Sequence, residues 1–195
     1  MYTEKTFSIP KLHGISDKTI EEHLKLYVGY VKDANLISEL LSKGEWEGDG
    51  GTYTKAELHR RFAFEWGGMR NHECYFSLLE GAAAPELDSS LVRAIETKWG
   101  SLDDWKKEFS ELALTRGVGW AMLYWDPVSK SLLNSWVEEQ HIGHLAGCDL
   151  IIALDMWEHS YVLDYFPSGK KQYVADFFSQ MNWRKAQAHF EAAVQ

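Results

Sequence analysis

A segment near the C-terminal end places two good metal ligands four residues apart in aromatic and apolar surroundings. It reads LDMWEHSYVLDY over residues 154–165 and contains Asp155 and His159. A buried carboxylate or imidazole is costly unless it is paired, hydrogen-bonded or bound to a metal. Two interpretations of this segment are open: an ordinary surface helix with an acidic rim, or one part of a metal site.

Two of the eight histidines fall on the apolar faces of predicted helices. His23 shares its face with Tyr27 and Tyr30, because residues one and two turns apart lie on the same side of a helix. His72 lies within the apolar stripe of a second predicted helix. Taken singly, each is also compatible with a hydrogen-bonded histidine of the core.

Taken together, these residues form a candidate donor set of three imidazoles and one carboxylate: His23, His72, Asp155 and His159. Such a set suits zinc, iron or manganese better than copper(I), which prefers sulfur, or calcium, which binds through oxygen. Four protein ligands leave room for water or hydroxide, so the site allows catalysis. The residues alone predict a metalloprotein whose metal stays open.

The elements that must position these residues form two halves. Helical spacing of apolar residues predicts a helix over 16–42 and a second whose stripe covers 58–79 and which ends near residue 85, joined by a glycine-rich loop at 44–51. Further helices are predicted at 88–99, 101–114, 171–178 and 183–194, and strands at 117–127, 131–137 and 149–155. We therefore predict an α+β protein: an N-terminal antiparallel helical hairpin domain (1–83), then a C-terminal α/β domain (84–195) with a small three-stranded antiparallel sheet.

The overall composition limits the partners and the compartment. The formal charge of −9 on 195 residues argues against nucleic-acid binding, which needs a basic surface. No apolar run approaches the roughly 20 residues of a membrane span, and the N-terminal MYTEKTFSIPKLHG lacks the pattern of a signal peptide. The two cysteines, Cys74 and Cys148, are too few for a disulfide framework. We expect a cytoplasmic protein that binds neither nucleic acid nor membranes.

The segment at 154–165 resembles the D-x-W-E-H-A-Y-Y signature of the iron/manganese superoxide dismutases, and the similarity extends over nearly the whole chain. GISDKTIEEH (14–23) looks like the segment that leads to the first metal ligand of that family. GGMRNHECYF (67–76) is similar to its G-G-x-x-N-H segment, and MNW (181–183) to its late V-N-W. GVGWAMLYWD (117–126) matches the strand that carries an active-site tryptophan, here Trp120.

The resemblance implies that the four candidate ligands hold one manganese or iron ion per subunit and that superoxide is the substrate. In the implied cycle, the trivalent metal takes an electron from one superoxide and releases oxygen, and the divalent metal gives it to a second, which leaves as hydrogen peroxide. Such chemistry requires a small and mostly dry cavity, whose wall Trp120, Trp157 and Tyr30 could supply. For Trp157, plain packing in the core is an equally good interpretation.

One family marker concerns the choice of metal. Iron enzymes commonly place a glutamine on the second helix four residues before the second ligand, where this chain has Gly68. Manganese enzymes instead bring a glutamine from the sheet, a place that Gln140 fills if the count back from Asp155 has no gap. A shift of one residue would put His141 there, as in metal-tolerant members. The resemblance therefore favours manganese, with iron as the alternative.

The family also predicts how subunits associate. In it, the glutamate of W-E-H reaches across a twofold interface to the ligand histidine of the partner, so Glu158 would brace His159 of a second copy. We therefore predict a homodimer, with a tetramer as a further option.

The chain departs from the family pattern in its gateway residues. Members carry H-x-x-x-H-H-x-x-Y-V from the first ligand, whereas here Tyr27 takes the fourth place and Tyr30 arrives one residue early. Either the helix has lost a one-residue bulge, or Tyr27 fills the gateway. The second tyrosine of E-H-A-Y-Y is Val162, so both ends of one hydrogen bond across the interface are missing together. Lys170 stands where the family usually has an arginine at the substrate entrance.

Two other classes of function fit the donor set. One is a zinc-dependent hydrolase with Glu158 as the base, although the chain has no H-E-x-x-H motif. The other is a metal-binding protein that kept the site and lost turnover, which the altered gateway allows. The sequence favours a superoxide dismutase over both.

Overall fold

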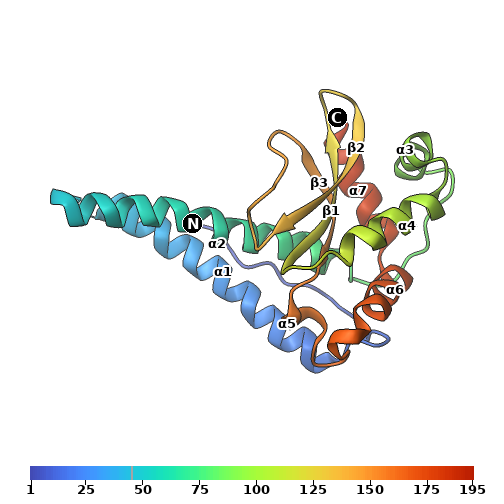
Figure 1. Cartoon of the computed structure of the whole chain (residues 1–195), viewed down its shortest axis with the longest axis horizontal. Helices are drawn as coiled ribbons and strands as arrows, with labels where there is room; N and C mark the ends of the chain where they lie inside the picture. Colours follow the sequence, from blue (N-terminus) through green and yellow to red (C-terminus); the bar gives the residue numbers. More distant parts are fainter. Residues whose placement is uncertain (45) are drawn as a thin grey trace.

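The chain folds into two long N-terminal helices followed by a mixed half of shorter helices and one sheet (Figure 1). The computed structural model describes residues 1–44 and 46–195. In chain order the elements are α1 (Asp17–Lys43), α2 (Gly48–Ser77), α3 (Ser90–Trp99), α4 (Leu102–Ala113), β1 (Gly119–Asp126), β2 (Ser131–Glu138), β3 (Asp149–Asp155), α5 (Glu158–Tyr161), the 3-10 helix η1 (Pro167–Gly169), α6 (Lys170–Gln180) and α7 (Trp183–Ala193). The predicted α+β class, with its helical hairpin and small sheet, is confirmed.

Helix α1 buries one stripe of side chains against α2. The Ser16 side chain caps its start by accepting a hydrogen bond from the backbone N–H of Thr19 at 3.2 Å. The buried residues recur every three or four positions and include His23, Tyr27 and Val31. The helical period therefore places His23, the first candidate ligand, on the buried face of α1. The far ends of α1 and α2 project from the rest of the molecule (Figure 1).

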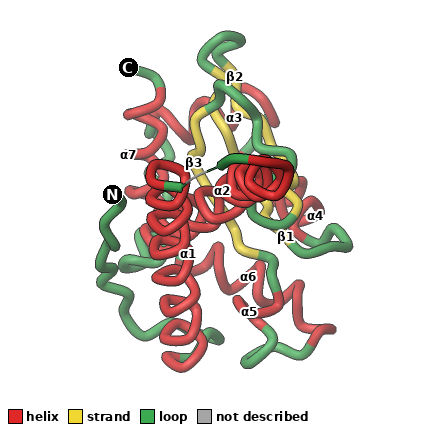
Figure 2. Tube along the Cα trace, turned by 90° about the vertical axis from the view of Figure 1, so that its left-hand side faces the viewer, coloured by secondary structure: helices red, strands yellow, loops and turns green. Residues whose placement is uncertain are grey.

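The glycine-rich segment at 44–51 is shorter as a loop than the sequence predicts. Helix α2 begins at Gly48, so its first turn takes in three glycines that the prediction assigned to the connection. Glycine is a poor helix former but does not forbid a helix, and here Gly51 lies directly against the backbone of Trp46. The two helices remain antiparallel neighbours, and Figure 2 looks at them from their projecting end.

The sheet has three antiparallel strands in the order β2-β1-β3. The central strand β1 is buried along most of its length, which matches its run of aromatic and aliphatic residues. In the register between β1 and β3, Trp120 lies opposite Asp155. The pairing therefore brings a large aromatic ring next to the carboxylate at the end of β3.

The remaining helices close the core around this sheet. Helix α7 contacts β3 and α3, and the buried end of α2 also contacts β3. The Ser101 side chain caps α4 by accepting a hydrogen bond from the backbone N–H of Asp104 at 3.0 Å. None of the described helices combines the length and the apolar character that a membrane crossing requires. The division into domains at residues 83 and 84 stays a prediction.

Candidate metal centre

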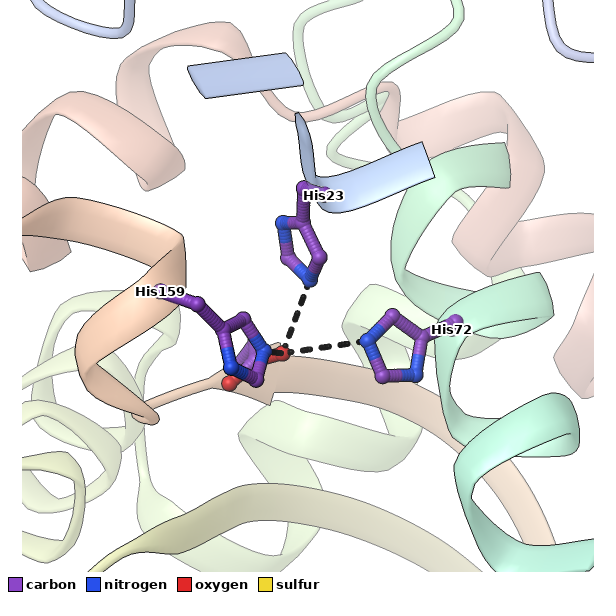
Figure 3. A group of neighbouring side chains, drawn as sticks. His23, His72 and His159 are labelled. Atoms are coloured by element: carbon purple, nitrogen blue, oxygen red, sulfur yellow. Dashed lines mark hydrogen bonds and ion pairs between the residues drawn. The ribbon is translucent and has the colours of Figure 1, made fainter. Parts of the chain in front are cut away.

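Four elements that are distant in the sequence bring the four candidate ligands together (Figure 3). His23 comes from α1, His72 from α2, Asp155 from the end of β3 and His159 from α5. One potential ligand atom from each lies within 4.8 Å of all the others, so the group could hold a metal ion. His23, His72 and Asp155 are almost completely buried, and the His159 side chain is 23% exposed.

The three imidazoles converge on a single carboxylate oxygen. The Nε2 atoms of His23 and His159 lie 3.1 Å and 3.2 Å from Asp155 Oδ2, and Nε2 of His72 lies 3.6 Å from it (Figure 3). The other carboxylate oxygen, Oδ1, accepts a hydrogen bond from the backbone N–H of Trp157 at 2.8 Å. That bond fixes the rotation of the carboxyl group, so that Oδ2 faces the histidines.

The tautomer of His72 tests whether this arrangement fits a cation. Nδ1 of His72 lies 2.6 Å from the backbone carbonyl oxygen of Gly68, so Nδ1 must carry the hydrogen and donate it. Burial lowers the pKa of His72 to about 3, and its ring is neutral near pH 7. Nε2 therefore carries no hydrogen, and its lone pair faces Oδ2 of Asp155. Nε2 has no hydrogen-bond partner among the described residues. A positive ion between the two atoms would satisfy both.

The charge of Asp155 supports the same conclusion. Burial by itself would raise the pKa of this carboxyl group, but the neighbouring His159 and the hydrogen bond from His23 hold the pKa below its usual value. Burial also lowers the pKa of His23. A buried carboxylate surrounded by imidazole nitrogens is the donor set that zinc, iron and manganese share.

Gln140 joins two aromatic rings that pack on His72. Its side-chain oxygen accepts from Trp120 Nε1 at 3.0 Å, and its side-chain nitrogen donates to the Tyr30 hydroxyl at 3.1 Å. The rings of Trp120 and Tyr30 lie with their centres 5.0 Å and 5.1 Å from that of His72. His141 instead packs edge-on against Phe64. The structure therefore places Gln140, in the turn after β2, next to two rings that pack on His72, and places His141 away from them.

The two tyrosines of α1 face different surroundings. The Tyr27 hydroxyl lies against the N-terminal segment, where it accepts from the backbone N–H of Lys5 at 2.8 Å and lies 3.3 Å from a carboxylate oxygen of Glu73. Tyr30 lies on the His72 side, and α1 is a regular α-helix over its whole length. The structure therefore places Tyr30, and not Tyr27, beside the candidate ligands.

The glycine at position 68 is required by this arrangement. A side chain there would overlap the ring of Tyr30, because even a Cβ atom has no room. A glutamine on α2 at this position is therefore incompatible with Tyr30 as it lies here.

The remaining predicted residues lie around the rim. Trp157 stacks on His159 with ring centres 5.7 Å apart and donates through Nε1 to the carbonyl oxygen of Glu139 at 3.2 Å. Glu158 is exposed next to His159. Lys170 lies over the ring of Tyr161, 5.7 Å from its centre, and burial lowers its pKa.

Several residues around the centre escaped the sequence analysis. Tyr173 donates to the backbone carbonyl oxygen of Asp155 at 2.9 Å, and Asn71 donates to that of Gln140 at 3.0 Å. The position of Asn71 directly before His72 was a usable signal. Tyr173 gave none, because its contact with Asp155 depends on segments that only the tertiary fold brings together.

Comparisons with known proteins agree with this geometry. A family model described as "Iron/manganese superoxide dismutases, C-terminal domain" matches residues 87–189. The chain is 36% identical to a superoxide dismutase [Fe] of Cupriavidus metallidurans, over 94% of this chain and 92% of the relative. The chain belongs to the iron/manganese superoxide dismutases.

Relatives of both metal types occur in this superoxide dismutase family. A superoxide dismutase [Mn] of Haloarcula marismortui is 34% identical over 85% of this chain and 80% of its own length. A superoxide dismutase [Fe] of Pyrobaculum aerophilum is 29% identical over 100% of this chain and 96% of its own length. Membership of the family therefore leaves the metal of this chain undecided.

Proposed function

We propose that this protein is a superoxide dismutase that converts two superoxide anions and two protons into oxygen and hydrogen peroxide. The convergence of three imidazole nitrogens on one carboxylate oxygen carries the proposal, since the bare Nε2 of His72 faces Asp155 and calls for a cation between them. His23, His72, Asp155 and His159 would hold one ion per subunit. A bound manganese or iron ion supplies a one-electron couple that accepts an electron from one superoxide and returns it to another.

The residues around the ligands would supply protons and exclude water. Gln140 donates to the Tyr30 hydroxyl, so the hydroxyl proton of Tyr30 remains free to point toward the site. Burial raises the pKa of Tyr30 well above its usual value, which keeps this hydroxyl protonated. Trp120 is completely buried, and with Trp157 it walls the ligands with apolar surface.

Manganese is the metal that we propose. The ring of Tyr30 leaves no room for a side chain at Gly68, so the glutamine beside the site comes from position 140. In the family that arrangement is typical of manganese enzymes. Iron is the alternative, because it accepts the same donor set.

The rim of the site favours an anionic substrate and a second subunit. Lys170 would attract superoxide toward the site, although less rigidly than an arginine. A hollow beside His23 and His159 is lined by the exposed apolar side chains of Leu26, Val162 and Leu163, with Glu22 and Glu158 at its edge. We propose that a second copy covers this face as a homodimer and that Glu158 of each subunit braces His159 of the other.

We also propose a cytoplasmic location for the protein. Its two cysteines, Cys74 and Cys148, are free thiols, and the cytoplasm keeps thiols reduced.

Metal analysis and a superoxide assay on one sample test the function. Protein purified from cells supplied with manganese, iron and zinc should contain about one manganese or iron per chain and should consume superoxide in proportion to that content. Zinc alone, or manganese and iron without turnover, would contradict the proposal.

A further inference from the structure

Gln140 lies in a tight loop whose shape is held by contacts with other elements. Glu138 and Ile142 close the loop through two backbone hydrogen bonds, of 2.8 Å and 3.1 Å. Between them Glu139 has φ 51°, a left-handed conformation that residues other than glycine rarely adopt. Because such a backbone persists only where its surroundings enforce it, the groups that bond this loop decide where the Gln140 side chain points.

Two side chains fill the hydrogen-bonding capacity of the Gln140 backbone carbonyl. Asn71 Nδ2 donates to this oxygen at 3.0 Å, and His144 Nε2 lies 3.1 Å from it. A carbonyl oxygen can only accept, and it has two lone pairs. His144 therefore carries its hydrogen on Nε2, and the two donors, one from α2 and one from the loop itself, saturate the oxygen.

A buried tyrosine, Tyr124, contacts the other ring nitrogen of His144, Nδ1, and determines that this nitrogen is unprotonated. With the hydrogen on Nε2, Nδ1 is an acceptor, and the Tyr124 hydroxyl lies 2.6 Å from it. The sulfur of Met122 lies 2.9 Å from the same hydroxyl but is a much weaker acceptor. Tyr124 is 2% exposed and belongs to β1. The hydroxyl thus selects the tautomer of His144 that can donate to Gln140.

Strand β1 therefore holds Gln140 at two points. Trp120 bonds its side-chain oxygen directly, and Tyr124, four residues further along the same face of the strand, holds its backbone through His144. The carboxamide nitrogen is then left to donate to Tyr30.

We propose that His144, oriented by Tyr124, is a positioning residue that fixes the Gln140 carboxamide between Trp120 and Tyr30. This inference rests on the proposed function, in which Gln140 acts beside the metal. It predicts that loss of His144 alters the surroundings of Gln140. The hydrogen-bond partners of His144 in the described part of the chain are Tyr124 and Gln140, and none is a candidate ligand.

The matched control is His189. Like His144 it is half-buried, and its Nδ1 lies 2.9 Å from a backbone carbonyl oxygen, that of Ile151. His189→Ala should therefore cost the same kind of hydrogen bond without touching the Gln140 loop. His144→Gln is the rescue variant, because a carboxamide can donate to Gln140 and accept from Tyr124.

The test uses NMR spectra of the full-length protein loaded with zinc, which is diamagnetic and accepts the same ligands. His144→Ala should shift the side-chain amide signals of Gln140 and the indole N–H signal of Trp120. His189→Ala should leave both in place, and His144→Gln should restore them partly. Unchanged signals in His144→Ala, or equal shifts in His189→Ala, would overturn the proposal. If His144→Ala does not fold, Tyr124→Phe decides in its place, with smaller shifts of the same signals expected.

Activity is measured separately on manganese-loaded protein, so that the two proposals can fail independently. His144→Ala should retain its metal and lose about three- to tenfold in turnover, less than the roughly 10- to 100-fold typical for direct outer partners of a metal site. If the unmodified protein does not consume superoxide, the proposed function fails, whereas the NMR result on His144 still stands or falls by itself.

Discussion

At the scale of single residues, His72 explains why the centre needs a cation. Its Nδ1 hydrogen is committed to the Gly68 carbonyl oxygen, which leaves a lone pair on Nε2 facing Asp155. Two acceptors opposed in a buried site are unfavourable, and the Nε2 atom of His72 does not recover the hydrogen bond that it lost with water. The site therefore fits a bound cation, and without one Nε2 of His72 has no partner among the described residues.

His72→Ala should lose metal and activity together. The variant removes one of the four candidate donors, the one that α2 contributes. Metal analysis and a superoxide assay on the same preparation measure both losses, each expected to exceed about tenfold. Full metal content together with full turnover would show that His72 is not a ligand.

Gly68→Ala should destabilise the protein by about 1–2 kcal/mol, because its Cβ would overlap the Tyr30 ring and overpacking outweighs the better helix propensity of alanine. Gly29→Ala on α1 is the matched control. Its Cβ would enter open space, so it should stabilise by roughly 0.5–1 kcal/mol. Urea unfolding of the metal-free proteins gives both values. Equal effects of the two substitutions would contradict the packing of Tyr30 on Gly68.

At the scale of elements, periodicity made most of the fold predictable. The apolar stripe through His23 placed that residue inside α1, and the helix predicted at 101–114 corresponds to α4. The strands predicted at 117–127, 131–137 and 149–155 correspond to β1, β2 and β3. The start of α2 was placed too late, because the weak helix propensity of glycine disfavours a helix without forbidding one.

The geometry around Gln140 was beyond prediction from local pattern. Its partners come from α1, α2, β1 and the loop after β2, and only the assembled fold sets their distances. The resemblance to the family pointed to Gln140 or His141 but gave no sign of His144, whose contact with the Gln140 carbonyl oxygen lies beside the left-handed turn at Glu139.

Ser101→Ala should lower the free energy of unfolding by about 1 kcal/mol, since its side chain satisfies an N–H in the first turn of α4. Ser110→Ala, in the same helix, is the control. The Ser110 hydroxyl bonds the Lys106 carbonyl oxygen within the helix, and such a bond adds little stability. Thermal unfolding curves compare the two variants. A larger loss in Ser110→Ala would contradict the cap.

At the scale of the whole molecule, the apolar face beside the metal centre predicts association. Leu163→Asp should convert a dimer into monomers, because a carboxylate would be buried against apolar side chains of a second copy. Leu163 is 65% exposed in the single chain. Val128→Asp is the control, at a 90% exposed position in the turn between β1 and β2. Light scattering after gel filtration gives the masses, and a wild-type monomer would contradict the proposed dimer.

The stability of the metal-free molecule should fall as the pH falls below about 6.5. Burial lowers the pKa of His144 and His189, so the folded state binds fewer protons than the unfolded state in this range. Each such histidine therefore contributes stability above the ordinary pKa of 6.5 that is lost on acidification, by up to about 1.4 kcal/mol per pH unit. The free energy of unfolding, measured with urea at several pH values between 5 and 8, should fall less steeply with decreasing pH in His189→Asn than in the wild type. Identical slopes would contradict a lowered pKa of His189.

Anomalous X-ray diffraction at the manganese and iron absorption edges tests the central claim most directly. Crystals of protein purified with both metals available should show one anomalous peak per chain, located between the side chains of His23, His72, Asp155 and His159. A peak elsewhere, or any of these four side chains turned away from it, would contradict the account.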